Sequence, residues 1–209
     1  GNQILYVGYI GTNEGSQYND IFAVLCDSFG IPIWAIAFDS FQFDEAHAVT
    51  FTTIGFVIVG KHNAGKDGFV LGLDWNGNIR IQLSLPNCDL TVVGVISFDR
   101  YVAVGSTIRN GQTFGLLLVG NAVGSITKLI QFEMPISQFP ILARSFTEMR
   151  NGHIVVIMDA YGDSSGEHIS QVVIAEIDLT SGDLIRSSLL GTAEDSFKVF
   201  CTSISISPQ

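Results

Sequence analysis

Residues 69–81 read FVLGLDWNGNIRI, which is an apolar run, a short turn centred on Gly77 and a second apolar run. The same pattern occurs three more times, around Gly30, Gly124 and Gly182, in residues 22–34 (FAVLCDSFGIPIW), 116–130 (LLLVGNAVGSITKLI) and 172–186 (VVIAEIDLTSGDLIR). The four glycines are spaced by 47, 47 and 58 residues. A repeat of roughly 40–50 residues that holds several strands is typical of a β-propeller or a related all-β array.

Each repeat is predicted to contain four strands, called a, b, c and d from the inside outward. Stretches rich in Val, Ile, Phe and Thr, bounded by Gly, Asn, Asp or Ser, are typical of strands. Strand a is predicted at 46–52, 90–98, 141–147 and 197–205, and strand b at 4–10, 56–61, 101–106 and 153–158. Strands c and d are the two apolar runs of each quoted stretch, and their turns carry the Gly and Asn residues that tolerate positive φ.

The chain opens on a strand b and closes on a strand a. These ends are complementary, and pairing them would remove the open sheet edges at which aggregation begins. We therefore predict one all-β domain, 1–209: a four-bladed β-propeller of four-stranded antiparallel sheets, with repeats at about 1–43, 44–87, 88–137 and 138–196 and with 197–209 completing the first blade. Half of a larger ring, completed by dimerisation, and a β-sandwich are the alternatives.

Composition excludes several classes of function. The net charge is −10, with 20 acidic and 10 basic residues, so a nucleic-acid partner is not expected. No apolar run approaches the ~18–20 residues of a membrane span, and no membrane insertion is predicted. The three cysteines show no metal-ligand spacing; no disulfide is expected between Cys26 and Cys201, because a strand b would lie between them. We predict no cofactor and no metal site, and the polar residues 1–3 show no signal peptide and leave the compartment open.

Several motifs resemble a known repeat family. They are 67–78 (DGFVLGLDWNGN), 20–27 (DIFAVLCD) followed by Trp34, 44–49 (DEAHAV) and 55–60 (GFVIVG). The pattern resembles the bacterial SBBP β-propeller repeats and the related delta-60-type repeats, although the third and fourth copies lack the tryptophan. The resemblance implies a propeller fold and favours an extracellular or surface location. It implies no catalytic residues.

The connections d–a and b–c are predicted to be long and to share one end of the blades. They are 11–19, 62–66, 107–113 and 159–170, and this loop face gathers many of the acidic residues. Long loops on a rigid scaffold often carry function. We therefore predict a non-catalytic binding or structural module, expected to be a monomer, that presents the acidic loop face to a protein or glycan partner. Its candidate contacts are Tyr18, Asp44, Glu45, Tyr161, Glu194 and Asp195.

The alternative is an enzyme that processes a glycan or a small molecule. Asp44-Glu45 and Glu194-Asp195 each begin a strand a, so they would crowd the channel mouth as a candidate acid and base. No nucleophile motif is present, and no catalytic residue is assigned. The loop 159–170 carries Asp159, Asp163, Glu167 and His168, but their spacing fits no known calcium loop and a solvated loop is expected.

Three basic residues are predicted to line the channel. His47, Arg144 and Lys198 occupy similar depths in three separate strands a. If they converge, like charges in a narrow space require an anion or carboxylates beside them. The acidic residues at the mouth are the expected compensation.

Overall fold

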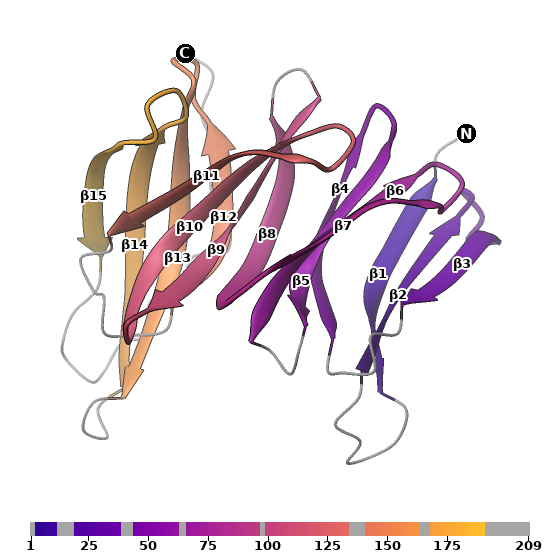
Figure 1. The fold of residues 1–209 in the computed structure, drawn as a ribbon, viewed down its shortest axis with the longest axis horizontal. Helices are drawn as coiled ribbons and strands as arrows, with labels where there is room; N and C mark the ends of the chain where they lie inside the picture. Colours follow the sequence, from indigo (N-terminus) through magenta and orange to yellow (C-terminus); the bar gives the residue numbers. More distant parts are fainter. Residues whose placement is uncertain are drawn as a thin grey trace. The chain divides into compact units, whose positions relative to one another are not determined.

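The computed structural model describes residues 3–11, 19–38, 44–62, 66–96, 99–133, 141–163 and 168–190. Every regular element in these ranges is a β-strand, and the strands form four antiparallel sheets (Figure 1). The predicted all-β class, with one antiparallel sheet from each repeat, is confirmed. Since these ranges contain no helix, no helical membrane span exists in them.

Each sheet consists of strands that are consecutive in the chain. Sheet 1 holds β1 (Ile4–Gly11), β2 (Asn19–Cys26) and β3 (Pro32–Phe38). Sheet 2 holds β4 (Glu45–Thr52), β5 (Gly55–His62), β6 (Asp67–Asp74) and β7 (Ile79–Leu85). Sheet 3 holds β8 (Cys88–Ile96), β9 (Arg100–Arg109), β10 (Gln112–Asn121) and β11 (Ile126–Glu133). Sheet 4 holds β12 (Ile141–Glu148), β13 (His153–Asp163), β14 (His168–Asp178) and β15 (Leu184–Leu190).

Sheets 2, 3 and 4 thus contain strands a to d in order, whereas sheet 1 has only b, c and d among the described residues. Its predicted strand a, 197–205, lies outside them. The chain divides into two compact units, 1–103 with 119–128 and 104–118 with 129–209. Each unit is described by itself below.

The c–d turns repeat one local chemistry. Gly30, Gly77, Gly124 and Gly182 all have positive φ, between 80° and 94°, as the sequence predicts. In the second turn the Asp74 carboxylate accepts hydrogen bonds from the backbone N–H groups of Asn76 and Asn78, at 2.8 and 2.9 Å. The equivalent positions Asp27, Asn121 and Asp178 accept in the same way. A short acceptor side chain at the start and a glycine near the end therefore define each turn.

Two of the predicted long loops are wrong. In sheet 3 the strands continue to Arg109 and resume at Gln112, so the connection is only Asn110-Gly111. Both residues have positive φ, 53° and 76°, as a tight two-residue hairpin requires. In sheet 4, β13 continues to Asp163 and β14 begins at His168. The predicted loop 159–170 is therefore mostly strand, because backbone pairing extends through its polar residues.

In the first unit, sheet 2 is buried on both faces. Its central strands, β5 and β6, are apolar from Phe56 to Gly60 and from Gly68 to Leu73, and Val57, Ile58 and Val59 are fully buried. Phe56, Ile58 and Leu71 pack with residues of sheet 1, while β8 of sheet 3 packs against β4, β5 and β6. A continuous apolar run, rather than strict alternation, is typical of strands covered on two sides. In the second unit, β13 and β14 bury a comparable apolar row that includes Ile154, Val156 and Val173.

A side chain from one sheet rests on the turn glycine of the next sheet. A Cβ at Gly77 would meet the Trp34 ring of β3 at 3.1 Å, and one at Gly124 would meet Ile81 of β7 at 2.3 Å. Trp34 Nε1 also donates to the Trp75 carbonyl oxygen at 3.0 Å. Trp34 and Ile81 each lie four residues after the glycine of their own sheet. Gly77 and Gly124 are therefore required for two reasons, the geometry of the turn and the close contact between sheets.

Gly77→Ala and Gly30→Ala separate these two requirements. Both glycines have φ near 80°, so each substitution should cost about 1 kcal/mol from left-handed backbone strain. Only Gly77 has a ring against it, whereas nothing described lies within 4 Å of a Cβ at Gly30. Chemical denaturation should show Gly77→Ala to be clearly the more destabilising. Equal losses would mean that the Trp34 contact contributes nothing.

Candidate functional site

The structure describes only some of the predicted site residues. Side chains are described for Asp44, Glu45, His47 and Arg144. Tyr161 lies in β13, but its side chain is outside the described part of the structure. The remaining four residues, Tyr18, Glu194, Asp195 and Lys198, also lie outside the described ranges.

His47 lies in a compact charged cluster in the first unit. Its Nδ1 is 3.0 Å from the carbonyl oxygen of Leu90 and 3.2 Å from the Asp89 carboxylate. Its Nε2 is 3.4 Å from the carboxylate of Glu45, which also pairs with Lys61 at 3.2 Å. Burial lowers the pKa of His47, but Asp89, the Leu90 carbonyl and Glu45 together outweigh burial. The net pKa of His47 therefore lies above its ordinary value.

Arg144 forms a buried ion pair in the second unit. Its Nε donates to the Asp159 carboxylate at 2.6 Å, and the Asp159 side chain is fully buried. From its polar surroundings in the sequence, Asp159 was expected in a solvated loop, where it was a weak calcium candidate. That placement is wrong, because Asp159 lies within β13, where it binds the guanidinium.

His47 and Arg144 occupy equivalent β-bulges. The register of β4 against β5 shifts between Ala46 and Ala48, and that of β12 against β13 shifts between Ala143 and Ser145. A bulge leaves one residue outside the ladder and re-aims its side chain. In both sheets this residue is a basic one held by carboxylates. Convergence of His47, Arg144 and Lys198 on one axis stays a prediction.

The acidic residues at the b–c end of sheet 2 have internal roles. Asp44 is 2% exposed, and Glu45 is shared between Lys61 and His47. Asp67 accepts a hydrogen bond from the backbone N–H of Asn87 at 3.1 Å, which stabilises the entry to β8. These carboxylates stabilise the sheet ends, so they contribute less to a free acidic surface than the sequence indicates. Within the described ranges, no group of three or more His, Cys, Asp or Glu side chains could hold a metal ion.

The structure also contains a serine–histidine pair that the sequence does not predict. His62 Nε2 lies 2.7 Å from Ser84 Oγ, beside a small cavity of about 70 Å³ that Asp44 also lines. The His62 ring packs edge-on against Phe69, with ring centroids 6.4 Å apart. The two residues are 22 positions apart on strands b and d. No sequence motif could have joined them, because the hairpin register alone brings them together.

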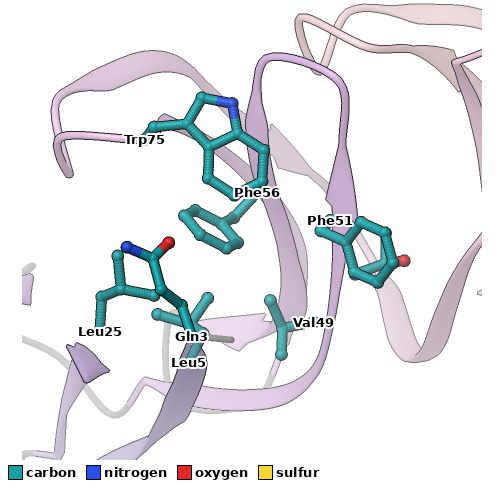
Figure 2. Close-up of a pocket in the computed structure, with 8 residues that line it drawn as sticks. Gln3, Leu5, Leu25, Val49, Phe51, Phe56 and Trp75 are labelled. Carbon is teal, nitrogen blue, oxygen red and sulfur yellow. The ribbon is translucent and has the colours of Figure 1, made fainter. Parts of the chain in front are cut away.

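A larger cleft lies at the opposite end of the sheets from the predicted loop face. It encloses about 510 Å³ between β1, β4 and the c–d turn of sheet 2. Leu5, Leu25 and Val49 line its base, and Phe56 and Trp75 lie over them (Figure 2). Gln3 and Thr50 add polar groups, and none of the described residues that line the cleft is charged.

The aromatic residues of this cleft are held by the fold. The Phe56 ring contacts Trp34 and Trp75 edge-on, with centroids 6.1 and 4.8 Å away. Trp75 Nε1 donates to the Thr53 carbonyl at 3.1 Å. Trp75 nevertheless remains 43% exposed, and Phe51 at the cleft is 69% exposed. The cleft is therefore rigid on the sheet 2 side and incompletely covered.

The ion pair between Arg144 and the buried Asp159 should contribute more to the stability of the fold than an exposed ion pair does. Arg144→Ala should destabilise the protein by about 3 kcal/mol, because it leaves the Asp159 carboxylate buried without its guanidinium. Arg186→Ala is the matched control: Arg186 is 73% exposed and pairs with Glu176, so about 1 kcal/mol or less is expected. Arg144→Met combined with Asp159→Leu should recover most of the loss. Equal losses for Arg144→Ala and Arg186→Ala in urea denaturation would contradict this assignment.

The His47 cluster predicts a pH-dependent contribution to stability. A raised folded-state pKa means that protonated His47 stabilises the native state fully below its unfolded pKa, and that this gain is lost as pH rises through the folded pKa. His47→Gln should therefore cost more at pH 5.5 than at pH 8.5. The same substitution in an Asp89→Asn background should show a smaller pH dependence. A penalty for His47→Gln that is equal at both pH values would refute the charged cluster.

Comparison with known proteins does not assign this chain to a family. No protein family model matches the chain, and no curated protein sequence is significantly similar to it. The resemblance to the SBBP and delta-60-type repeats therefore stays a prediction, and function has to be argued from the geometry of the molecule.

Proposed function

We propose that this chain is a non-catalytic binding module built on a four-bladed β-propeller that closes through its C-terminal strand. Four sheets of sequential strands and the two-sided burial of sheet 2 support the proposal. Sheet 1 has no strand a among the described residues, and the strand a predicted from the sequence at 197–205 supports closure.

The observation that carries the binding function is the β13–β14 hairpin. Its strands have 11 residues each. β12 pairs with β13 as far as Ala160, and β15 pairs with β14 as far as Val172. Three further residue pairs, from Tyr161–Ser170 to Asp163–His168, continue the hairpin beyond these described neighbours. We call residues 161–170 the arm; at ~3.3 Å per residue, its paired part is roughly 10 Å long.

The arm has the composition of a contact surface. It reads YGDSSGEHIS, with one tyrosine, two carboxylates and several small polar residues. Tyrosine contributes a large contact area at low entropic cost, and Ser and Gly provide adaptable hydrogen bonds. Together with the net charge of −10, this composition favours a basic protein segment as the partner. A neutral glycan is the other outcome of the test.

The enzyme alternative gains no support from the described residues. Glu45 is already compensated by Lys61 and His47, so it is not a free base. The opposing pair, Glu194 and Asp195, lies outside the described ranges. We therefore propose the binding function alone.

The arm can be tested with a lysine-rich decapeptide and with an array of neutral oligosaccharides. Asp163→Asn with Glu167→Gln should weaken decapeptide binding about fivefold at low salt, because exposed ion pairs contribute about 0.2–1 kcal/mol each. Tyr161→Ala should weaken binding further. The difference between variants should shrink at high salt, where charges are screened.

Asp99→Asn with Asp183→Asn is the matched control. It removes the same charge from turns at the other end of sheets 3 and 4, and the asparagine introduced at position 99 retains an oxygen that can accept from Thr53 N–H. If the control variant weakens decapeptide binding equally, the effect is one of net charge alone, and the arm is not the binding site. Oligosaccharide binding that depends on Tyr161 alone would identify a glycan as the partner.

A further inference from the structure

The first unit contains a cleft that the proposed function does not use. It encloses about 510 Å³, which lies within the roughly 300–1,000 Å³ typical of small-molecule sites. Its described lining residues all belong to the first unit: Gln3, Leu5, Leu25, Val49, Thr50, Phe51, Phe56 and Trp75. Leu25 and Phe56 are buried members of the hydrophobic core, and Leu5 and Val49 pack against that core. The packing that holds sheets 1 and 2 together therefore also forms the floor of the cleft.

The aromatic wall of the cleft is positioned before any ligand arrives. The Phe56 ring meets Trp75 edge-on, with centroids 4.8 Å apart and an angle of 74° between the planes. Trp75 Nε1 donates to the Thr53 carbonyl oxygen, and the Trp75 carbonyl oxygen accepts from Trp34 Nε1. Both the side chain and the backbone of Trp75 are thus held. A wall that is already ordered loses little conformational freedom on binding, which favours affinity.

Two aromatic rings of the cleft remain accessible to a ligand. Phe51 and Trp75 are 69% and 43% exposed, although both line a cleft with an apolar floor (Figure 2). A ligand that covers the floor would also cover part of these rings. Burial of apolar surface would drive such binding.

The polarity of the lining selects the class of ligand. None of the described lining residues is charged, so a charged group of a ligand would lose its hydration without gaining an ion pair. Gln3 and Thr50 are the two described lining residues with polar side chains. They can serve one or two hydrogen-bonding groups, but they cannot satisfy the many hydroxyl groups of a sugar. The lining therefore fits a neutral and mainly apolar molecule.

We propose that this cleft binds a neutral small molecule that has a flat apolar ring system and one or two hydrogen-bonding groups. The ring system lies on the floor and against Trp75 and Phe51, and Gln3 and Thr50 orient its polar group. The site is separate from the arm, which belongs to the second unit and is expected to bind a basic segment. It also does not depend on ring closure.

Two fluorescent probes with one ring system test the class of ligand. N-phenyl-1-naphthylamine is neutral and flat and carries a single N–H donor, whereas 8-anilino-1-naphthalenesulfonate adds a sulfonate to the same rings. We expect saturable binding of the naphthylamine, seen as an increase in its fluorescence. The sulfonate should bind about tenfold more weakly, because the cleft offers it no cation. The difference should persist at high salt, where repulsion by the net charge of −10 is screened.

Tryptophan emission shows whether the probe lies in the cleft. The chain has two tryptophans, so Trp34→Phe leaves Trp75 as the only one. In this variant the naphthylamine should quench the remaining tryptophan emission over the same concentration range in which its own fluorescence rises.

Two exposed phenylalanines provide a matched pair of variants. Phe51→Ala should weaken naphthylamine binding about fivefold, because it removes one ring from the site. Phe29→Ala is the control: Phe29 is 88% exposed but lies in the turn between β2 and β3 and does not line the cleft. It should leave binding unchanged. Since both side chains are exposed, neither substitution should prevent folding.

Several results would overturn the proposal. Absence of saturable binding would mean that the cleft is filled in solution, and equal affinity for the two probes at high salt would refute a neutral site. Weakening by Tyr6→Ala but not by Phe51→Ala would place the probe on the opposite face of sheet 1, because Tyr6 follows Leu5 in β1. Asp163→Asn with Glu167→Gln should leave naphthylamine binding unchanged, so this site and the arm succeed or fail separately.

Discussion

Burial of sheet 2 on both faces is the constraint on which the described structure depends. Sheet 1 lies on one face and β8 on the other. The middle of β5 and of β6 is continuously apolar because neither face meets water there. A module of this kind cannot be stable alone, since one face would always remain uncovered. Repetition of the sheet, with a small side chain or a glycine at each close contact, is the physical solution.

Two groups of ion pairs lie where the regular ladder is interrupted. His47 and Arg144 leave the ladder at equivalent bulges and meet Asp89, Glu45 and Asp159. A bulge leaves one residue outside the ladder and changes the direction of its side chain relative to a regular strand. The bulges thus provide a position at which a polar residue occurs in a strand a without disturbing the apolar packing on either side.

Repetition made the four antiparallel sheets predictable from the sequence, whereas the candidate site was only partly predictable. Local chemistry was sufficient for the turns, since Asp74, Gly77 and their equivalents act within five residues of one another. The prediction of long loops at 107–113 and 159–170 was wrong, because polar composition suggested loops where backbone pairing continues. The partners of His47 and Arg144, and the Ser84–His62 contact, depend on register between strands. Register is set by turns and bulges together, and a single sequence shows bulges poorly.

The order of the strands also bears on how the chain acquires its structure. Every sheet is a meander of consecutive strands, so most pairing needs only short loops to close and can begin near the N-terminus during synthesis. In sheet 1, Ile4, Tyr6, Tyr9 and Ile10 of β1 remain about half exposed in the described structure. An exposed apolar edge strand is a site at which incompletely folded molecules associate. Sheet 1 is therefore a part of the described structure at which chains that are still folding would pair with one another.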